Sequence, residues 1–223
     1  MIPLKDEIPT RRFPIINLLL ILANIAVFGL QWLAGPYEQA MVSTFAMVPA
    51  AFGQVGLLAV GSIFTSMFMH GGLLHLGGNM LYLWIFGDNV EDAMGSFKYL
   101  LFYLAGGVVA ALAHIATNPG STIPTVGASG AIAAVLGAYL VLYPNARVLT
   151  IIPLGVFMRL TTVPAIIVLG LWFVLQLANG MLTLGGPDVG GVAFWAHIGG
   201  FVFGLLAGKV LAGWRRPQSA NAW

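Results

Sequence analysis

The chain has 223 residues, of which 59% are hydrophobic and 7% are charged, and its mean hydropathy is +0.94. Soluble domains carry about 25% charged residues, so this chain has too few charges to cover a water-facing surface, and we predict an integral membrane protein. The absence of cysteine excludes a disulfide framework and a thiolate metal site, and a formal charge of +2 is too small to indicate nucleic-acid binding.

A polar segment with several prolines, residues 1–14, precedes the first long apolar run at residues 15–34. The polar segment is too long for the short basic region of a signal peptide. The apolar run is longer than the core of a signal peptide and lacks a clear cleavage site with small residues. We therefore interpret residues 1–14 as a cytoplasmic segment and the apolar run as a retained first span.

Six apolar runs are candidates for membrane spans, and breakers rich in Gly, Pro and Asn separate them. The predicted fold is an all-α, polytopic bundle of six transmembrane helices. Its domain covers residues 15–212, and a cytoplasmic tail follows at 213–223. No internal repeat is evident, which argues against the inverted-repeat architecture of many transporters. The spans are placed at residues 15–34, 73–90, 97–117, 126–143, 162–182 and 192–212.

The basic residues favour six spans over seven. With six spans and a cytoplasmic N-terminus, all nine Lys and Arg fall on the cytoplasmic side, as the positive-inside rule expects. The competing topology treats residues 54–69 as a further span and would place six of the nine outside. Residues 35–70 then form a long apolar first loop on the outer side. We expect this loop to be embedded in the outer leaflet, where irregular backbone must be buried against protein.

Four polar residues near the outer ends of three spans form the candidate site. His75 and Asn79 lie near the start of the second span, Ser129 near the start of the fourth, and His197 near the start of the sixth. These three spans all begin on the outer side, so the four residues are expected at a similar depth. Polar and ionisable side chains within membrane spans are costly, which makes them functional candidates.

Ser129 and His197 have the chemistry of a nucleophile and its base. A serine hydroxyl needs a nearby base to take its proton, and a neutral imidazole can do this near neutral pH. No Asp or Glu lies in these spans at that depth, which favours a dyad over a triad. His75 and Asn79 are four residues apart, so they share a helix face and could both donate to a developing oxyanion.

Small residues would allow the fourth and sixth spans to approach closely. Ser129, Ala133 and Gly137 recur every four residues on the fourth span, and Gly200 and Gly204 are four apart on the sixth. Such small faces let membrane helices pack tightly, which would bring His197 to Ser129. Taken alone, a serine among glycines is usually a packing residue, and a lone intramembrane histidine is as often structural. The joint arrangement favours a site.

At this point the chain resembles the rhomboid family of intramembrane serine proteases over about residues 15–212. The matching stretches are HGGLLHLGGNMLYLWIFGDNVED, VGASGAIAAVLGAY and AHIGGFVFG, in the order typical of the family. The resemblance implies that Ser129 is the nucleophile and His197 the general base and later acid. His75, Asn79 and the backbone N–H of Ser129 would form the oxyanion hole.

The resemblance also implies a water-filled cavity open to the outside and a short central fourth helix. It suggests that substrates approach past the fifth span, with the Gly-rich stretch 184–191 as a candidate mobile cap. Two features depart from the family pattern. Some members carry an aromatic residue four positions after the nucleophile, where this chain has Ala133, and the Trp-Arg pair of the first loop is absent.

The sequence therefore predicts an endopeptidase that cleaves single-span membrane proteins near the outer membrane face through an acyl-enzyme. It predicts no cofactor, no metal and no nucleic-acid partner, and it leaves the oligomeric state open. The expected location is the plasma membrane of a prokaryote, with both termini in the cytoplasm. The alternative is a non-proteolytic, rhomboid-like scaffold that binds single-span clients through the same groove.

Overall fold

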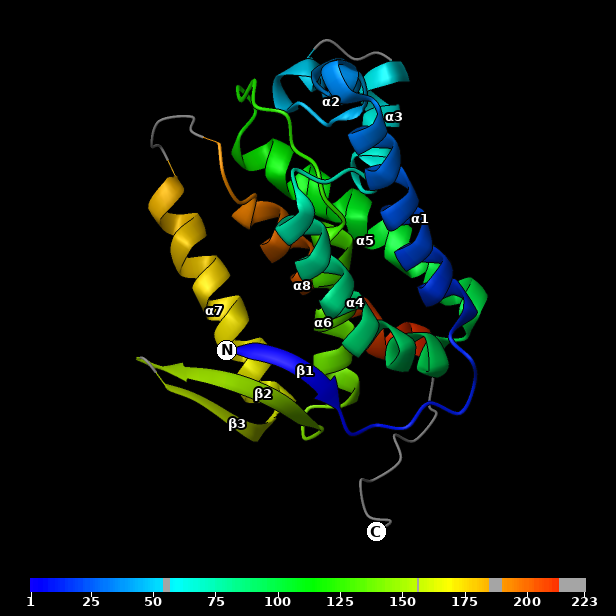
Figure 1. Cartoon of the computed structure of the whole chain (residues 1–223), viewed down its shortest axis with the longest axis vertical. Coiled ribbons are helices and arrows are strands. Elements are labelled where there is room, and N and C mark those ends of the chain that lie inside the picture. The colour runs from blue at the N-terminus through cyan, green and yellow to red at the C-terminus, as the bar shows by residue number, and fades with distance from the viewer. Residues whose placement is uncertain (54–56, 156, 185–189, 213–223) are drawn as a thin grey trace.

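The computed structural model describes residues 1–53, 57–155, 157–184 and 190–212. In these ranges, eight α-helices form a bundle, and three strands lie across one of its ends (Figure 1). The helices are α1 (Ile15–Leu33), α2 (Glu38–Phe45), α3 (Leu57–Ser66), α4 (Leu73–Met94), α5 (Ser96–Thr117), α6 (Ser129–Leu142), α7 (Ala165–Thr183) and α8 (Phe194–Ala212). The strands are β1 (Ile2–Asp6), β2 (Arg147–Leu154) and β3 (Phe157–Pro164), and short 3-10 turns lie at Gly35–Tyr37 and Pro49–Gly53.

Each of the six predicted spans corresponds to a helix. By length and composition, α1, α5, α7 and α8 could each cross a membrane, so the chain is a multi-pass membrane protein. Helix α6 is a shorter apolar helix of 14 residues. Helix α4 has 22 residues, but polar side chains such as His75, Asn79 and Glu91 interrupt its apolar run.

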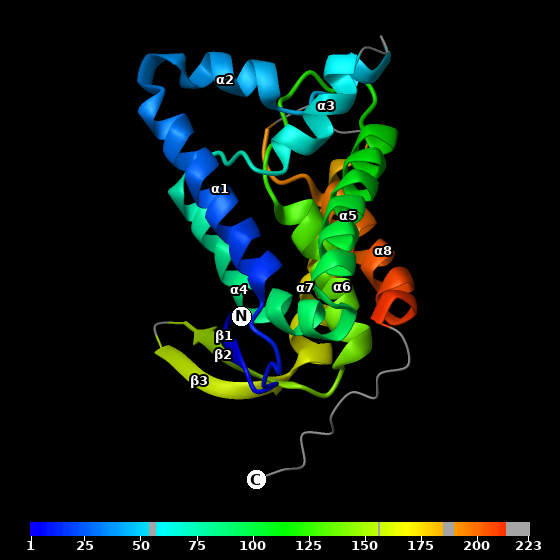
Figure 2. The same cartoon turned by 90° about the vertical axis from the view of Figure 1, so that its right-hand side faces the viewer.

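The first loop is folded rather than extended. It contains α2 and α3, which lie at the end of the bundle opposite the strands (Figure 2). Helix α3 has 10 residues, so at 1.5 Å per residue it is about 15 Å long, half of a hydrocarbon layer of about 30 Å. This length argues against the competing seventh span at 54–69, of which residues 54–56 lie outside the described ranges.

The prediction of an all-α fold is wrong at one end of the molecule. The segment expected to be a loop after the fourth span forms a β2–β3 hairpin, and β1 from the N-terminal segment adds an antiparallel third strand. β-Branched residues are frequent in RVLTIIPL and FMRLTTVP, which suits strands. Hydropathy alone missed the sheet, because β1 pairs with a partner more than 140 residues away in sequence. Strand β3 also occupies 162–164, so the helix predicted at 162–182 starts at Ala165.

The basic residues gather at the end of the bundle that carries the sheet. Seven of the nine lie in the described ranges, within strands, in the segment that joins β1 to α1, or at helix ends that meet there; Arg215 and Arg216 lie outside them. This distribution is what the positive-inside rule expects of a cytoplasmic end. The seven residues are Lys5, Arg11, Arg12, Lys98, Arg147, Arg159 and Lys209.

Helix α6 forms the centre of the bundle. Its residues from Gly130 to Tyr139 are all buried, between α4, α5 and α8. The contact with α8 is close enough to need glycine. A Cβ at Gly200 would collide with the carbonyl oxygen of Gly130, and a Cβ at Gly204 with that of Ala134. The predicted packing of small faces is therefore present, and on α8 it places the glycines against the α6 backbone itself.

The sheet is fastened to the base of α6 by a buried carboxyl group. Asp6 on β1 is 8% exposed. Its Oδ2 accepts hydrogen bonds from the Tyr139 hydroxyl at 2.6 Å and from the Asn89 amide at 2.9 Å. Burial raises the pKa of Asp6 from its usual 3.8 to about 7; the hydrogen bond from Tyr139 opposes this rise and the nearby charge of Asp88 adds to it. The N-terminal strand is thus tied to the helix that begins with Ser129.

The α6–α8 contact predicts a sharp difference between two glycine substitutions. Gly204→Ala should lower the free energy of unfolding by about 1–3 kcal/mol, because two backbones must separate to admit the methyl group. Gly170→Ala on α7 is the control, since nothing lies within 4 Å of a Cβ built there. Thermal unfolding of purified protein in detergent measures both. Equal stability of the two variants would contradict the packing.

The Asp6 carboxyl predicts a pH-dependent stability. The folded-state pKa of Asp6, about 7, lies above its usual 3.8. The protonated carboxyl therefore contributes its full share to the free energy of unfolding below pH 4, and this share is lost as the pH rises to 7 and the folded protein must bury a charge. Asp6→Asn keeps a neutral hydrogen-bond acceptor. The variant should match the wild type near pH 4 and exceed it at pH 8 by on the order of 2 kcal/mol. Thermal unfolding across this range is the measurement, and parallel curves would refute the assignment.

Candidate active site

Ser129 begins helix α6 inside the bundle rather than at its rim. Helix α6 has 14 residues, about 21 Å, whereas the neighbouring α5 has 22 residues, about 33 Å. The chain runs back beside α5 before α6 starts, so the start of α6 lies below the end of the bundle that carries α2 and α3 (Figure 2). As the first residue of the helix, its N–H is among those without an intrahelical acceptor. The Ser129 hydroxyl therefore lies within the bundle, beside the free backbone N–H groups of the first turn of α6.

The turn before Ser129 requires glycine. Gly127 has φ 130°, a conformation that other residues rarely adopt, and its N–H donates to the Ser66 carbonyl oxygen at 2.9 Å. A Cβ at this position would lie 2.9 Å from His75 Nε2 and 3.6 Å from Ser129 Oγ. The missing side chain thus lets the imidazole of His75 and the hydroxyl of Ser129 approach the same small space.

His197 lies in the first turn of α8 and faces Ser129. Its Nε2 is 2.8 Å from Ser129 Oγ, within hydrogen-bonding distance. The side chain is 8% exposed. The α6–α8 glycine contacts begin one turn further along, at Gly200, and hold the two helix starts side by side. The structure therefore brings together the two residues that the sequence singled out as nucleophile and base.

His75 and Asn79 lie on one face of α4, as predicted from their spacing. The Gly71 N–H donates to His75 Nδ1 at 3.4 Å, which leaves Nε2 as the nitrogen that carries a proton toward the turn at Gly127. Asn79 is 8% exposed, and its buried amide nitrogen has no hydrogen-bond partner among the described residues. An unused buried donor is costly unless something occupies it at some stage. Both side chains line the same cavity as Ser129 and carry N–H groups.

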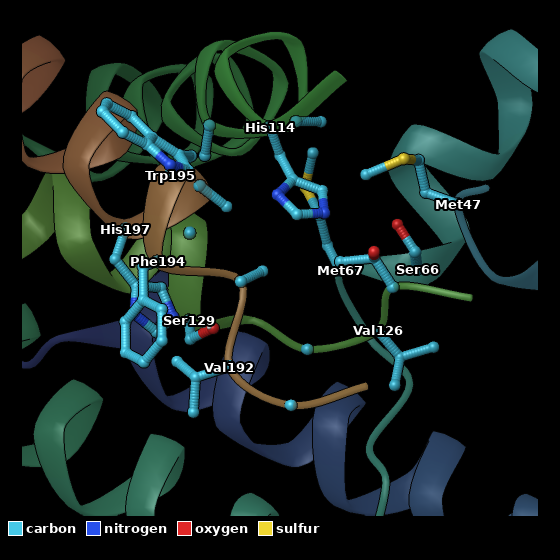
Figure 3. A pocket seen from close by; sticks show the side chains of 18 of the residues that line it. Met47, Ser66, Met67, His114, Val126, Ser129, Val192, Phe194, Trp195 and His197 are labelled. Atoms are coloured by element: carbon cyan, nitrogen blue, oxygen red, sulfur yellow. Dashed lines mark hydrogen bonds between the residues drawn. The ribbon is translucent and has the colours of Figure 1, made fainter. Parts of the chain in front are cut away.

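All four residues line one cavity of about 870 Å³. It extends from Ser129 and His197 toward Met47, Ser66 and His114, and Figure 3 shows these side chains around the same space. Its walls come from the first loop, α4, α5, α6, α7 and the start of α8. Residues 185–189, most of the candidate cap, lie outside the described ranges. The cavity is large enough to hold water and an extended peptide segment beside the Ser–His pair.

Two residues of α7 that the sequence analysis did not single out complete the surroundings of His197. Gln176 Oε1 lies 2.8 Å from His197 Nδ1, and the ring of Trp172 packs against the imidazole at 5.8 Å between centroids with a 33° tilt. The aromatic neighbour missing at Ala133 thus comes from a different helix. Gln176 could have been suspected from sequence, because it is a polar residue in an apolar span and lies one turn after Trp172.

The donor set suits neither a metal nor a carboxylate triad. Among the described residues, no group of three or more His, Cys, Asp or Glu side chains is placed to hold a metal ion. The described residues that line the cavity include no Asp or Glu. What the arrangement offers is a hydroxyl, an imidazole and N–H donors, the kinds of group that acyl transfer uses.

Comparison with known proteins decides the family. The Rhomboid domain family model matches residues 58–214 of this chain. The chain belongs to the rhomboid family. This rhomboid is 34% identical over 166 residues to "Rhomboid protease GluP" of Bacillus subtilis, an alignment that covers 72% of the chain and 29% of that relative. The family and its multi-pass membrane character, both predicted from sequence, are therefore confirmed.

Mitochondrial proteins are also among the relatives. The rhomboid is 30% identical over 194 residues to human "Presenilin-associated rhomboid-like protein, mitochondrial", covering 83% of the chain and 45% of the relative. It is 29% identical over 212 residues to yeast "Rhomboid protein 1, mitochondrial", covering 90% and 56%. The chain thus spans between under a third and just over half of the length of these relatives.

Proposed function

We propose that this rhomboid is an intramembrane serine endopeptidase that cleaves membrane-protein substrates near the outer membrane face. The observation that carries the proposal is the 2.8 Å contact between Ser129 Oγ and His197 Nε2 at the wall of a cavity inside a membrane bundle. The named protease among its relatives supports the same activity. The proposed topology has six spans, α1 and α4 to α8, with the sheet and both termini in the cytoplasm.

In the proposed mechanism, Ser129 Oγ attacks the substrate carbonyl carbon while its proton passes to His197 Nε2. The resulting oxyanion accepts hydrogen bonds from His75 Nε2–H, from the Asn79 amide and from the backbone N–H of Ser129. The C–N bond then breaks as His197 returns the proton to the leaving amine. Water attacks the acyl-enzyme by the same route in reverse, with His197 taking the proton of water and passing it to Ser129.

The substrate class follows from backbone chemistry. A peptide bond in an intact helix has its carbonyl and N–H already paired, so a transmembrane helix must unwind locally before Ser129 can reach it. We propose single-span membrane proteins with Gly, Pro or polar residues near the outer end of the span as substrates. We also propose 15–212 as the protease domain and a prokaryotic plasma membrane as its location, which the Bacillus subtilis relative favours and membrane fractionation would test.

The Ser–His pair predicts labelling by a fluorophosphonate probe. The wild type should label covalently at Ser129, and Ser129→Ala and His197→Ala should each reduce labelling and cleavage of a membrane reporter by at least about a thousand-fold. His114→Ala is the matched control, because His114 lines the same cavity from α5. A wild type that binds single-span clients but neither labels nor cleaves would favour the scaffold function instead.

The proposed oxyanion donors have a separate test. Asn79→Ala and His75→Ala should each lower kcat by about ten- to a thousand-fold, the usual loss for one such donor, while Ser129 stays in place. Asn179→Ala is the control, since that amide is exposed and bonds to its own helix at Leu175. Steady-state cleavage in proteoliposomes is the measurement. Unchanged rates in both donor variants would remove these residues from the oxyanion hole.

A further inference from the structure

We infer that Gln176 of α7 is the positioning residue for His197, and that it holds the imidazole in the tautomer that can accept the Ser129 proton. The inference rests on the proposed function and extends it to a residue on a third helix. It starts from the two contacts of the imidazole, with Nε2 at 2.8 Å from Ser129 Oγ and Nδ1 at 2.8 Å from Gln176 Oε1. Both ring nitrogens are therefore engaged.

The chemistry of an amide oxygen decides where the imidazole proton lies. A neutral imidazole carries one N–H, and an amide oxygen can only accept a hydrogen bond. Gln176 Oε1 therefore requires the proton on Nδ1, which leaves the Nε2 lone pair free for the Ser129 hydroxyl. With the amide nitrogen in this place, the proton would move to Nε2, and the ring could no longer act as a base. The orientation of one side chain thus separates a competent site from an inert one.

Packing of α7 on α8 fixes where this side chain can reach. Trp172 lies one turn before Gln176 and contacts both His197 and Phe201, each at 5.8 Å between ring centroids. One turn after Gln176, the Gly180 carbonyl oxygen accepts a hydrogen bond from the Trp195 indole at 3.1 Å. Positions 172, 176 and 180 form one stripe on α7 against the start of α8. Gln176 is therefore held between two fixed contacts and directed at His197 Nδ1.

A neutral amide suits this depth better than the carboxylate of a triad. Burying an ionised carboxylate among membrane helices is costly, whereas an amide supplies an acceptor without a charge. When His197 takes the proton of Ser129, the bond from Nδ1–H to Gln176 becomes charge-assisted and strengthens. The hydrogen bond to Gln176 then stabilises the imidazolium more than the neutral imidazole. An interaction that strengthens as the proton moves lowers the barrier to the attack by Ser129.

The test compares Gln176→Leu with Gln176→Glu in the full chain. Leucine removes the acceptor, and we expect kcat and the rate of fluorophosphonate labelling to fall about ten-fold or more with KM unchanged, because base orientation and not binding is lost. An ionised glutamate is acceptor-only, so at a pH high enough to ionise the introduced carboxyl, Gln176→Glu should keep activity within about three-fold of wild type. Asn179→Leu, one turn away on the exposed face, should behave as wild type.

A second readout separates positioning from a structural role. In protein labelled with ¹⁵N-histidine, the His197 signal, identified by its loss in His197→Ala, should report a proton on Nδ1 in the wild type and a mixture of tautomers in Gln176→Leu. An unchanged tautomer together with unchanged kcat in Gln176→Leu would overturn the inference. A wild type that never labels would instead overturn the proposed function, and the tautomer measurement would still test the contact between Gln176 and His197.

Discussion

The close approach of α6 and α8 is the constraint on which the rest of this structure depends. Gly200 and Gly204 lie directly against the carbonyl oxygens of Gly130 and Ala134, so the two backbones meet without side chains between them. In a membrane, where helices gain little from the hydrophobic effect, such contact supplies dispersion attraction. The same contact aligns the first turns of both helices. Ser129 and His197 lie in those first turns, and their separation follows from the packing.

The shortness of α6 determines where Ser129 lies in the bundle. A helix of 14 residues among helices of 19 to 22 cannot reach both ends of the bundle. The helix stops short on the side away from the sheet, and the space above Ser129 is a cavity whose largely apolar wall carries a few polar side chains. The Ser129 hydroxyl can therefore lie within the bundle and still line a cavity, as the proposed hydrolysis of an acyl-enzyme by water would require. Glycines allow α6 to pack closely against α8, and the shortness of α6 leaves room for the cavity above Ser129.

The two ends of α6 have opposite surroundings. At its start, Ser129 contacts His197 and lines a cavity together with His75 and Asn79. At its base, Tyr139 donates to the buried Asp6 of the sheet, which anchors the helix from below. The peripheral α7 has few buried residues and contacts the site through Trp172 and Gln176. The Ser129 end of the Ser129–His197 contact is thus on a firmly anchored helix, and the proposed positioning residue of His197 comes from a helix with fewer buried residues.

The sequence by itself predicted the multi-pass membrane class, a helix at each of the six apolar runs, the family, and four residues that line one cavity. Hydropathy, charge placement and short motifs are local properties of the chain, which is why they can be read without the structure. It did not disclose the sheet, since β1 and β2 pair across more than 140 residues of sequence. It also did not disclose Gln176 or Trp172 as neighbours of His197. Which face of α7 meets α8 depends on how the helices rotate and cross, and only the tertiary structure decided that.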